Sequence, residues 1–183
     1  MDQSAVIPGT KLYRDVKSLY LSAFPEEERR PFEILWVLSV IKSPVLLRAY
    51  RENGTFCGFT LTVDSDPYLY INFIAVSPSN RSHGCGTLIL DELRQEFPDR
   101  AMLVEVEAPV DGSPNREQRE RRIRFYERNG FVQLDRSITG RGVSYILLST
   151  AHEFDREAYQ RIFPHLSFGV KSGIKRFLAR LKP

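Results

Sequence analysis

The sequence predicts one α/β domain built on a mixed β-sheet. Its 183 residues suit a single domain with a sizeable hydrophobic core. No internal repeat or low-complexity linker divides the chain. The periodic segments run in the order helices, hairpin, strand, helix, strand, helix and two strands, so a strand–helix–strand unit lies at the centre of the sheet.

The first third of the chain predicts two helices and a hairpin. Residues 10–23 have apolar side chains at a helical period, namely Leu12, Val16, Leu19 and Leu21. A turn or short helix opens at Pro25, and a second helix follows at residues 32–38. Strands at 45–51 and 56–63 flank Glu52-Asn53-Gly54, and Asn-Gly between apolar runs is a strong hairpin signal.

The remaining segments complete the sheet. Residues 68–76 are almost free of charge, which predicts a central strand that is buried on both faces. The next predicted helix carries the apolar residues Ile89, Leu90, Leu93 and Phe97 and stops at Pro98. A strand at 102–107 and a helix at 116–129, capped by Gly130, follow it. Two further strands are expected at 131–134 and 143–148. Residues 1–150 form the predicted domain, and 151–183 are a helical extension packed on it, broken at Pro164 and Gly169.

Composition narrows the class of protein. A hydrophobic fraction of 42%, a charged fraction of 27% and a net charge of +3 are ordinary for a soluble protein and give no argument for nucleic acid. The apolar run Ile34–Ile41 is far shorter than the roughly 20 residues that span a bilayer, and charged residues near the start leave no signal peptide. We therefore expect a cytoplasmic protein without a transmembrane segment.

The metal-ligating residue types show no metal-site spacing. Two cysteines, Cys57 and Cys85, make neither a disulfide framework nor a zinc cluster, so we expect reduced, buried thiols. The three histidines, His83, His152 and His165, lie far apart in the sequence. The sequence therefore predicts no bound metal.

The most informative segment is the loop that follows the central strand. It runs from Ala75-Val76 through Arg81 into a helix, with Gly84 and Gly86 at its end. A diphosphate needs converging backbone N–H groups with no side chain in the way and the positive end of a helix. The alternative is a plain turn whose glycines supply a positive φ.

These residues resemble a known signature. Arg81-x-x-Gly84-x-Gly86 after a strand is similar to the CoA-binding signature of the GNAT superfamily of N-acyltransferases, and not to a dinucleotide fingerprint or a P-loop. A second match lies about forty residues later, where Tyr126 precedes Asn129-Gly130-Phe131. The two signatures cover residues 68–135, and the order of elements extends the resemblance over residues 10–149.

The resemblance implies a GNAT-like fold with a centrally splayed sheet, in which acetyl-CoA lies between strands 68–76 and 102–107. The implied cosubstrate-binding residues are Ile74 and Val76, whose N–H groups face the thioester oxygen, then Arg81, Ser82, His83, Gly84, Cys85, Gly86 and Thr87 of the loop, and Tyr126. Tyr126 is also the implied catalytic acid, which protonates the departing thiolate. A core aromatic residue is the alternative for Tyr126.

This sequence departs from the family pattern at two points. Arg119 stands where many relatives have an asparagine that holds the pantetheine arm, and Asn115 is a weaker substitute. Tyr70 and Asn72 stand where some relatives have a glutamate as general base. The base is then Glu105 or Glu107, acting through water, or the amine arrives already deprotonated.

We therefore predict an enzyme that moves an acetyl group from acetyl-CoA to the amine of a small molecule or peptide. The amine attacks directly, because Cys85 in the phosphate loop is poorly placed as a nucleophile. The alternatives are a non-catalytic acyl-CoA-binding module and a nucleic-acid-binding domain that uses the arginines of the 116–129 helix. We expect these arginines to pair with glutamates on a solvated helix, and we expect no nucleic-acid partner.

Three features remain open at the level of sequence. The acids Glu26, Glu27 and Glu28 suit the first turn of a helix and would also attract a cationic substrate. The basic amphipathic stretch at residues 171–182 packs on its own domain or contacts a membrane or a partner subunit. A homodimer is compatible with the sequence, which does not determine the oligomeric state.

Overall fold

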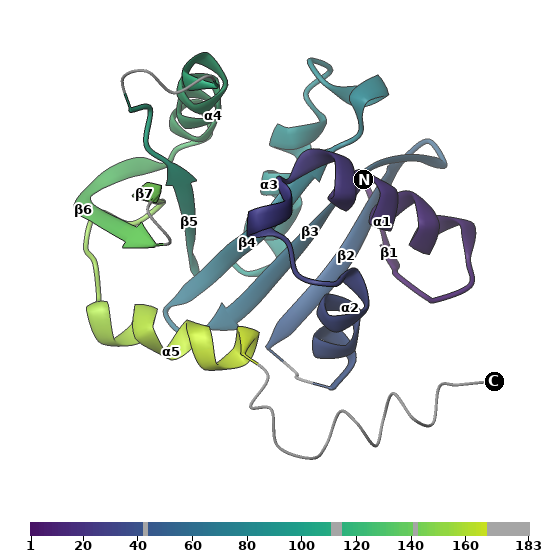
Figure 1. Ribbon diagram of the computed structural model, residues 1–183, viewed down its shortest axis with the longest axis horizontal. Coiled ribbons are helices and arrows are strands. Elements are labelled where there is room, and N and C mark those ends of the chain that lie inside the picture. Colours follow the sequence, from purple (N-terminus) through teal and green to yellow (C-terminus); the bar gives the residue numbers. More distant parts are fainter. Residues whose placement is uncertain (42–43, 111–114, 141–142, 168–183) are drawn as a thin grey trace.

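The computed structural model describes residues 1–41, 44–110, 115–140 and 143–167. These residues form one mixed seven-stranded sheet in the order β1-β2-β3-β4-β5-β7-β6 (Figure 1). The strands are β1 (Asp2–Ala5), β2 (Val45–Glu52), β3 (Thr55–Ser65), β4 (Tyr68–Val76), β5 (Ala101–Glu107), β6 (Val132–Gly140) and β7 (Val143–Ser149). β4 and β5 pair in parallel, and the other neighbours pair antiparallel. The predicted α/β fold is confirmed.

Helices cover both faces of the sheet. They are α1 (Lys11–Ala23), α2 (Phe32–Ile41), α3 (Cys85–Glu96), α4 (Arg116–Arg128) and α5 (Arg156–Leu166), with short 3₁₀ turns at η1 (Glu26–Glu28) and η2 (Pro78–Asn80). Helices α1, α2 and α5 share one hydrophobic core with the sheet, and α3 and α4 share a second core. In Figure 1, α1, α2 and α5 lie in front of the sheet and α3 lies behind it.

The first half of β4 is buried on both faces, as its lack of charge predicts. Tyr68 and Tyr70 point into the first core, whereas Leu69 and Ile71 point into the second. This alternation follows from the two-residue period of a strand. The central strand therefore joins the two halves of the domain.

β4 and β5 separate beyond their first four residue pairs. Pairing runs from Tyr68 with Ala101 to Ile71 with Val104 and then stops, although both strands continue. On its other edge, β4 shifts register against β3 at the same point, which leaves Asn72 as an extra residue. Such a β-bulge bends its strand and increases the local twist. The bulge thus accounts for the splay between the two strands.

Several local predictions are wrong in detail. Leu21, counted among the apolar positions of the first helix, is 45% exposed, and Tyr20 is buried instead against Phe24 and Phe73. Pro164 lies within the last turn of α5 and does not break the helix. The reason is that the buried side chains of Ile162 and Leu166 hold this segment against the first core.

Two strands also differ from the prediction. Strand β1 was not predicted, and β6 is longer than expected.

Gly130, with φ of 80°, ends α4 as predicted, and the Phe131 N–H group donates to the Tyr126 carbonyl as in a Schellman motif. Gly169 and the basic stretch 171–182 lie outside the described residues. In the described ranges, every helix is too short or too polar to cross a bilayer.

Candidate functional site

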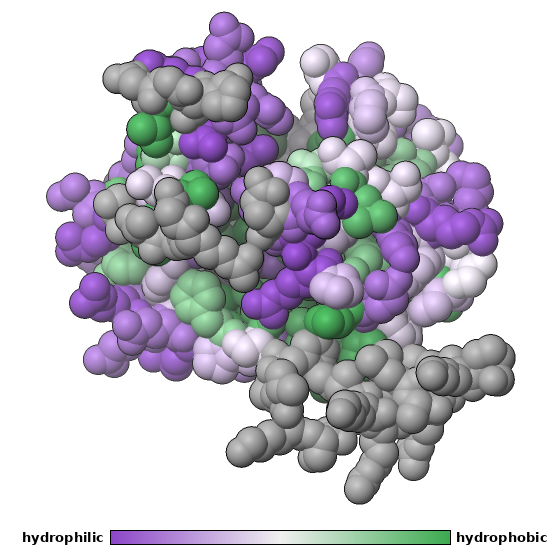
Figure 2. Space-filling view, viewed as in Figure 1, coloured by the Kyte–Doolittle hydropathy of each residue, from purple (hydrophilic) through white to green (hydrophobic). Residues whose placement is uncertain are grey.

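A cleft of about 600 Å³ opens where β4 and β5 separate. Its walls come from β4, the loop into α3, β5, the inner side of α4 and the end of α1. In the view of Figure 2 the surface is hollowed at its upper edge, on the side where Figure 1 places α4 and the segment that follows β4. All the predicted binding residues line this cleft except His83, which lies outside it in an exposed position.

The backbone of β4 presents hydrogen-bond donors to the cleft. Ser77 N–H bonds the Cys57 carbonyl at 2.8 Å, in register with the pairing of Val76 with Gly58. Alternate residues of an antiparallel strand point their N–H groups to opposite edges. The N–H groups of Ile74 and Val76 therefore point away from β3 toward the open edge, where β5 has left the ladder. Free donors at this position can stabilise a negative oxygen.

The loop after β4 is held by its own hydrogen bonds. The Asn80 amide donates to the Phe56 carbonyl at 3.2 Å and to Ser77 Oγ at 2.7 Å. Arg81 Nε donates to the Val76 carbonyl at 3.3 Å. These contacts bring the guanidinium of Arg81 to the edge of the cleft, where it can bind an anion.

The two glycines of the loop have different physical roles. Gly84 is the N-cap of α3 with φ of 81°, and a Cβ added there would meet no atom within 4 Å. Gly84 therefore supplies a left-handed turn that leaves the space above the helix open. A Cβ on Gly86 would lie 3.0 Å from two ring carbons of Phe125. Gly86 therefore allows α3 and α4 to pack closely beside the cleft.

Tyr126 lies in the wall of the cleft on α4. Its ring is 3% exposed and packs against Phe125 and Phe131 at centroid distances of 5.2 and 5.1 Å. Burial raises the pKa of Tyr126 to about 12, and the nearby charge of Arg122 opposes this shift. The hydroxyl has no hydrogen-bond partner among the described residues. A phenol with this pKa is protonated at neutral pH and can donate its proton or a hydrogen bond.

The two glutamates considered as bases have different surroundings. Glu105 lines the cleft and accepts hydrogen bonds from Tyr70 at 3.1 Å and Tyr159 at 2.7 Å. Burial, and then the Glu105 carboxylate, raise the pKa of both tyrosines. Glu107 lies outside the cleft lining and pairs with Arg119. Only Glu105 is therefore placed to act on a molecule in the cleft.

Arg119 takes no part in the cleft. Its guanidinium donates to Glu107 at 3.1 Å and to the Ala108 carbonyl at 2.9 Å, which fixes the end of β5 to α4. The neighbouring Gln118 lines the cleft, whereas Asn115, the residue considered as a substitute, does not. Of these two amides, Gln118 is thus the one that can reach a ligand arm.

Three arginines of α4 line the cleft, although the sequence predicted a solvated helix with glutamate-paired arginines. The expected glutamate pairs do form, with Arg116 and Arg124 beside Glu120 and Arg121 beside Glu117. Arg121, Arg122 and Arg128, however, border the cleft. Arg122 and Arg128 have no carboxylate partner among the described residues. Arg122 precedes Tyr126 by four residues, and this helical spacing could have placed the arginine on the same face.

A comparison with protein families decides the family. The sequence model of the acetyltransferase (GNAT) domain matches residues 42–133, a segment that contains the splayed strands, the loop and Tyr126. The chain belongs to the GNAT acetyltransferase family. It is an acyltransferase, as the sequence predicts, and the reaction of this family moves an acyl group from acetyl-CoA to an amine.

Solved structures of GNAT proteins resemble the whole fold. A GNAT-family protein from Bacteroides thetaiotaomicron is 26% identical, with a TM-score of 0.68 over 84% of this chain and 88% of its own. An aminoglycoside 6′-N-acetyltransferase in complex with coenzyme A is 16% identical, with a TM-score of 0.63 over 85% of this chain and 99% of its own. A spermidine N-acetyltransferase from Vibrio cholerae is 13% identical, with a TM-score of 0.59 over 83% of this chain and 95% of its own. A comparison with curated protein sequences gives no significant match.

Proposed function

We propose that this GNAT enzyme acetylates an amine by direct attack on acetyl-CoA bound in the cleft between β4 and β5. The observation that carries the proposal is the end of strand pairing at Ile71 and Val104, beside the loop and Tyr126. The residues present fit the cosubstrate. The first turn of α3 offers free N–H groups to a pyrophosphate, and Arg122 and Arg128 offer cations to its phosphates.

The proposed reaction uses three groups of the cleft. Glu105, through a water molecule, takes the proton that the amine must lose. The N–H groups of Ile74 and Val76 donate to the thioester oxygen as negative charge grows on it. Tyr126 gives its proton to the sulfur of CoA as the carbon–sulfur bond breaks. The products are an N-acetyl amide and CoA with a neutral thiol.

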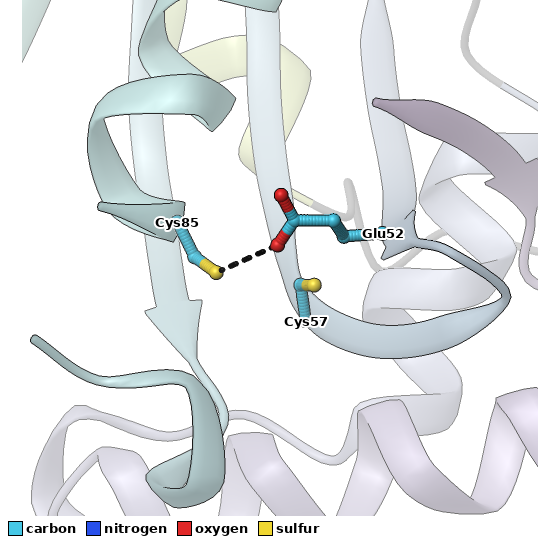
Figure 3. A group of neighbouring side chains, drawn as sticks. All are labelled: Glu52, Cys57 and Cys85. Atoms are coloured by element: carbon cyan, nitrogen blue, oxygen red, sulfur yellow. Dashed lines mark hydrogen bonds between the residues drawn. The ribbon is translucent and has the colours of Figure 1, made fainter. Parts of the chain in front are cut away.

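A covalent acetyl-enzyme plays no part in this mechanism. Cys85 has its side chain buried, at 1% exposure, and points toward Glu52 (Figure 3). Burial first, and then Cys57 and Glu52, raise the pKa of the Cys85 thiol to about 11. Little nucleophilic thiolate is therefore present at neutral pH.

The acceptor is the amine of a small molecule or of a peptide. Proteins with this fold include an aminoglycoside acetyltransferase and a spermidine acetyltransferase, so the fold alone does not select among amines. The two free thiols fit a reducing compartment, which supports the cytoplasm as the place of action.

The test has a binding arm and a reaction arm. Acetyl-CoA at about 100 times its Kd should stabilise the folded protein by roughly 2.7 kcal/mol, measured as a thermal shift. A panel of amines is then screened for release of CoA. Absence of any thermal shift would contradict acyl-CoA binding. An acetylated protein that forms without an amine, detected by mass spectrometry, and then transfers its acetyl group would contradict direct attack.

A further inference from the structure

Three metal-ligating side chains meet outside the proposed reaction path. Glu52 ends β2, Cys57 follows on β3, and Cys85 begins α3. One ligand atom from each residue lies within 4.8 Å of the other two. Figure 3 shows the Cys85 sulfur and the Glu52 carboxylate pointing toward each other beside Cys57. Both cysteines are buried and free.

The separation of these atoms fits a small tetrahedral ion. Zinc lies about 2.3 Å from a thiolate sulfur and about 2.1 Å from a carboxylate oxygen. A tetrahedral arrangement then sets sulfur and oxygen roughly 3.6 Å apart and two sulfurs roughly 3.8 Å apart. The Cys85 Sγ to Glu52 Oε2 distance is 3.7 Å. This pair already meets the requirement, and all three ligand atoms, which lie within 4.8 Å of one another, would close around the ion.

The chemistry of the donors selects the class of metal. Thiolates favour zinc and similar soft ions over magnesium and calcium, which prefer an all-oxygen shell. Three protein ligands leave a fourth position for water, as in zinc sites that are not closed. We propose that Glu52, Cys57 and Cys85 bind one zinc ion. Binding forms two zinc–sulfur bonds and one zinc–oxygen bond and releases the two thiol protons to solvent.

A metal at this place would join the hairpin to the phosphate loop. Glu52 and Cys57 flank the β2–β3 turn, and Cys85 directly follows Gly84. The ion would therefore fix the first residue of α3 and stabilise the loop that faces the cleft. The effect on acetyl-CoA affinity rests on the proposed function of the cleft, whereas metal binding itself does not.

The site is tested with cobalt and zinc alone. Protein without an affinity tag is treated with a chelator and titrated with Co²⁺, and the absorption spectrum is recorded. We expect one equivalent to bind with thiolate-to-cobalt charge-transfer bands and the visible bands of tetrahedral Co²⁺. Zn²⁺ should displace it and raise the Tm. Absence of these bands in folded protein would overturn the proposal.

Matched variants locate the ion. Cys57→Ser and Cys85→Ser should each abolish the charge-transfer bands, and Glu52→Gln should weaken binding at least tenfold. Two variants should bind like the parent: His83→Gln, which removes the imidazole of the same loop, and Glu153→Gln, which removes an exposed carboxylate. Bands that survive both cysteine substitutions would place the metal elsewhere and overturn the proposal.

A second measurement needs no variant. The chain has only two cysteines, so the X-ray absorption spectrum of zinc-loaded parent protein should fit two sulfur ligands and two oxygen or nitrogen ligands. A spectrum without sulfur would overturn the site. A Cys57–Cys85 disulfide that forms with peroxide in protein that binds no metal would show a redox pair instead. Failure of acetyl-CoA to bind the zinc-loaded protein would count against the proposed function and leave the metal site standing.

Discussion

Arg119 donates a hydrogen bond of 3.1 Å to Glu107, and both side chains are only 13% exposed. The pair lies outside the cleft, at the end of β5 and the start of α4. Two residues earlier on the same strand, Glu105 faces the cleft and the hydroxyl of Tyr159. One short strand thus carries two carboxylates of the same type, one structural and one available for chemistry.

The two glutamates make a matched pair for the first prediction. Glu105→Gln should lower kcat on the order of 100- to 10,000-fold, the usual contribution of a general base, with acetyl-CoA affinity preserved. Glu107→Gln should preserve kcat and lower the free energy of unfolding by about 1 to 3 kcal/mol, because Arg119 loses its charged partner. Steady-state kinetics and urea unfolding measure both effects. Equal kcat losses in the two variants would show that Glu105 is not the base.

Gly84 and Gly54 form a second matched pair. Both have a positive φ, 81° and 77°, and a Cβ on either would meet no atom within 4 Å. Alanine at either position should therefore cost a similar backbone strain, about 1 to 2 kcal/mol. Only the methyl group at residue 84 enters the space proposed for the pyrophosphate, so only Gly84→Ala should weaken acetyl-CoA binding, by roughly 10- to 200-fold. Calorimetric titration of both variants would reveal whether the loop binds the cosubstrate or is only a turn.

The third prediction concerns the arginines of α4. Arg122 lines the cleft without a carboxylate partner in the described parts of the chain, whereas Arg124 faces outward beside Glu120. Arg122→Ala should lower acetyl-CoA affinity about tenfold or more, since hydrogen bonds to charged groups contribute about 1.5 to 3 kcal/mol. It should also reduce the salt dependence of binding. Arg124→Ala should do neither, and a similar loss in both variants would indicate only a general effect of helix charge.

The features that the sequence could predict are those whose motifs lie within one short stretch of chain. Arg81, Gly84 and Gly86 lie in one short loop, and Tyr126 lies four residues before Gly130, which caps its helix. Each group thus has a local signal, and the resemblance to the GNAT signatures implied that the two groups share one cleft. The Asn53-Gly54 turn likewise predicted its hairpin. Strand β1 escaped prediction because Asp2–Ala5 has no alternating apolar pattern, and its pairing with β2 decides its conformation.

Tertiary contacts explain what the sequence could not predict. The splay depends on an extra residue, Asn72, which is visible only once β3 and β4 are in register. Tyr159 reaches Glu105 from a helix that is 54 positions away in the chain. The Glu52, Cys57 and Cys85 cluster joins three elements, so no spacing rule for metal sites detects it.

The last prediction separates catalysis from packing at Tyr126. Tyr126→Phe should keep the fold and most of the acetyl-CoA affinity, because the ring still packs against Phe125 and Phe131. Its kcat should fall on the order of 100- to 10,000-fold if the hydroxyl is the general acid and chemistry limits turnover. A loss seen only in KM would instead indicate a binding contact. Tyr13→Phe, on α1 and outside the cleft lining, is the control and should have the parent's kcat.

The pKa of Tyr126 gives this prediction a pH signature. Its folded-state value of about 12 exceeds the ordinary value of 10, so the folded state holds the phenolic proton more tightly than the unfolded chain. This contribution to stability is complete below pH 10 and is lost as the pH rises from 10 to 12. The Phe variant should lack this part of the alkaline loss of stability. Below pH 10 the acid stays protonated, so any fall in the parent's kcat/KM between pH 7 and 9 must come from another group. Should Tyr126→Phe turn over at the parent's rate with chemistry shown to be rate-limiting, Tyr126 is a packing residue and CoA leaves without its proton.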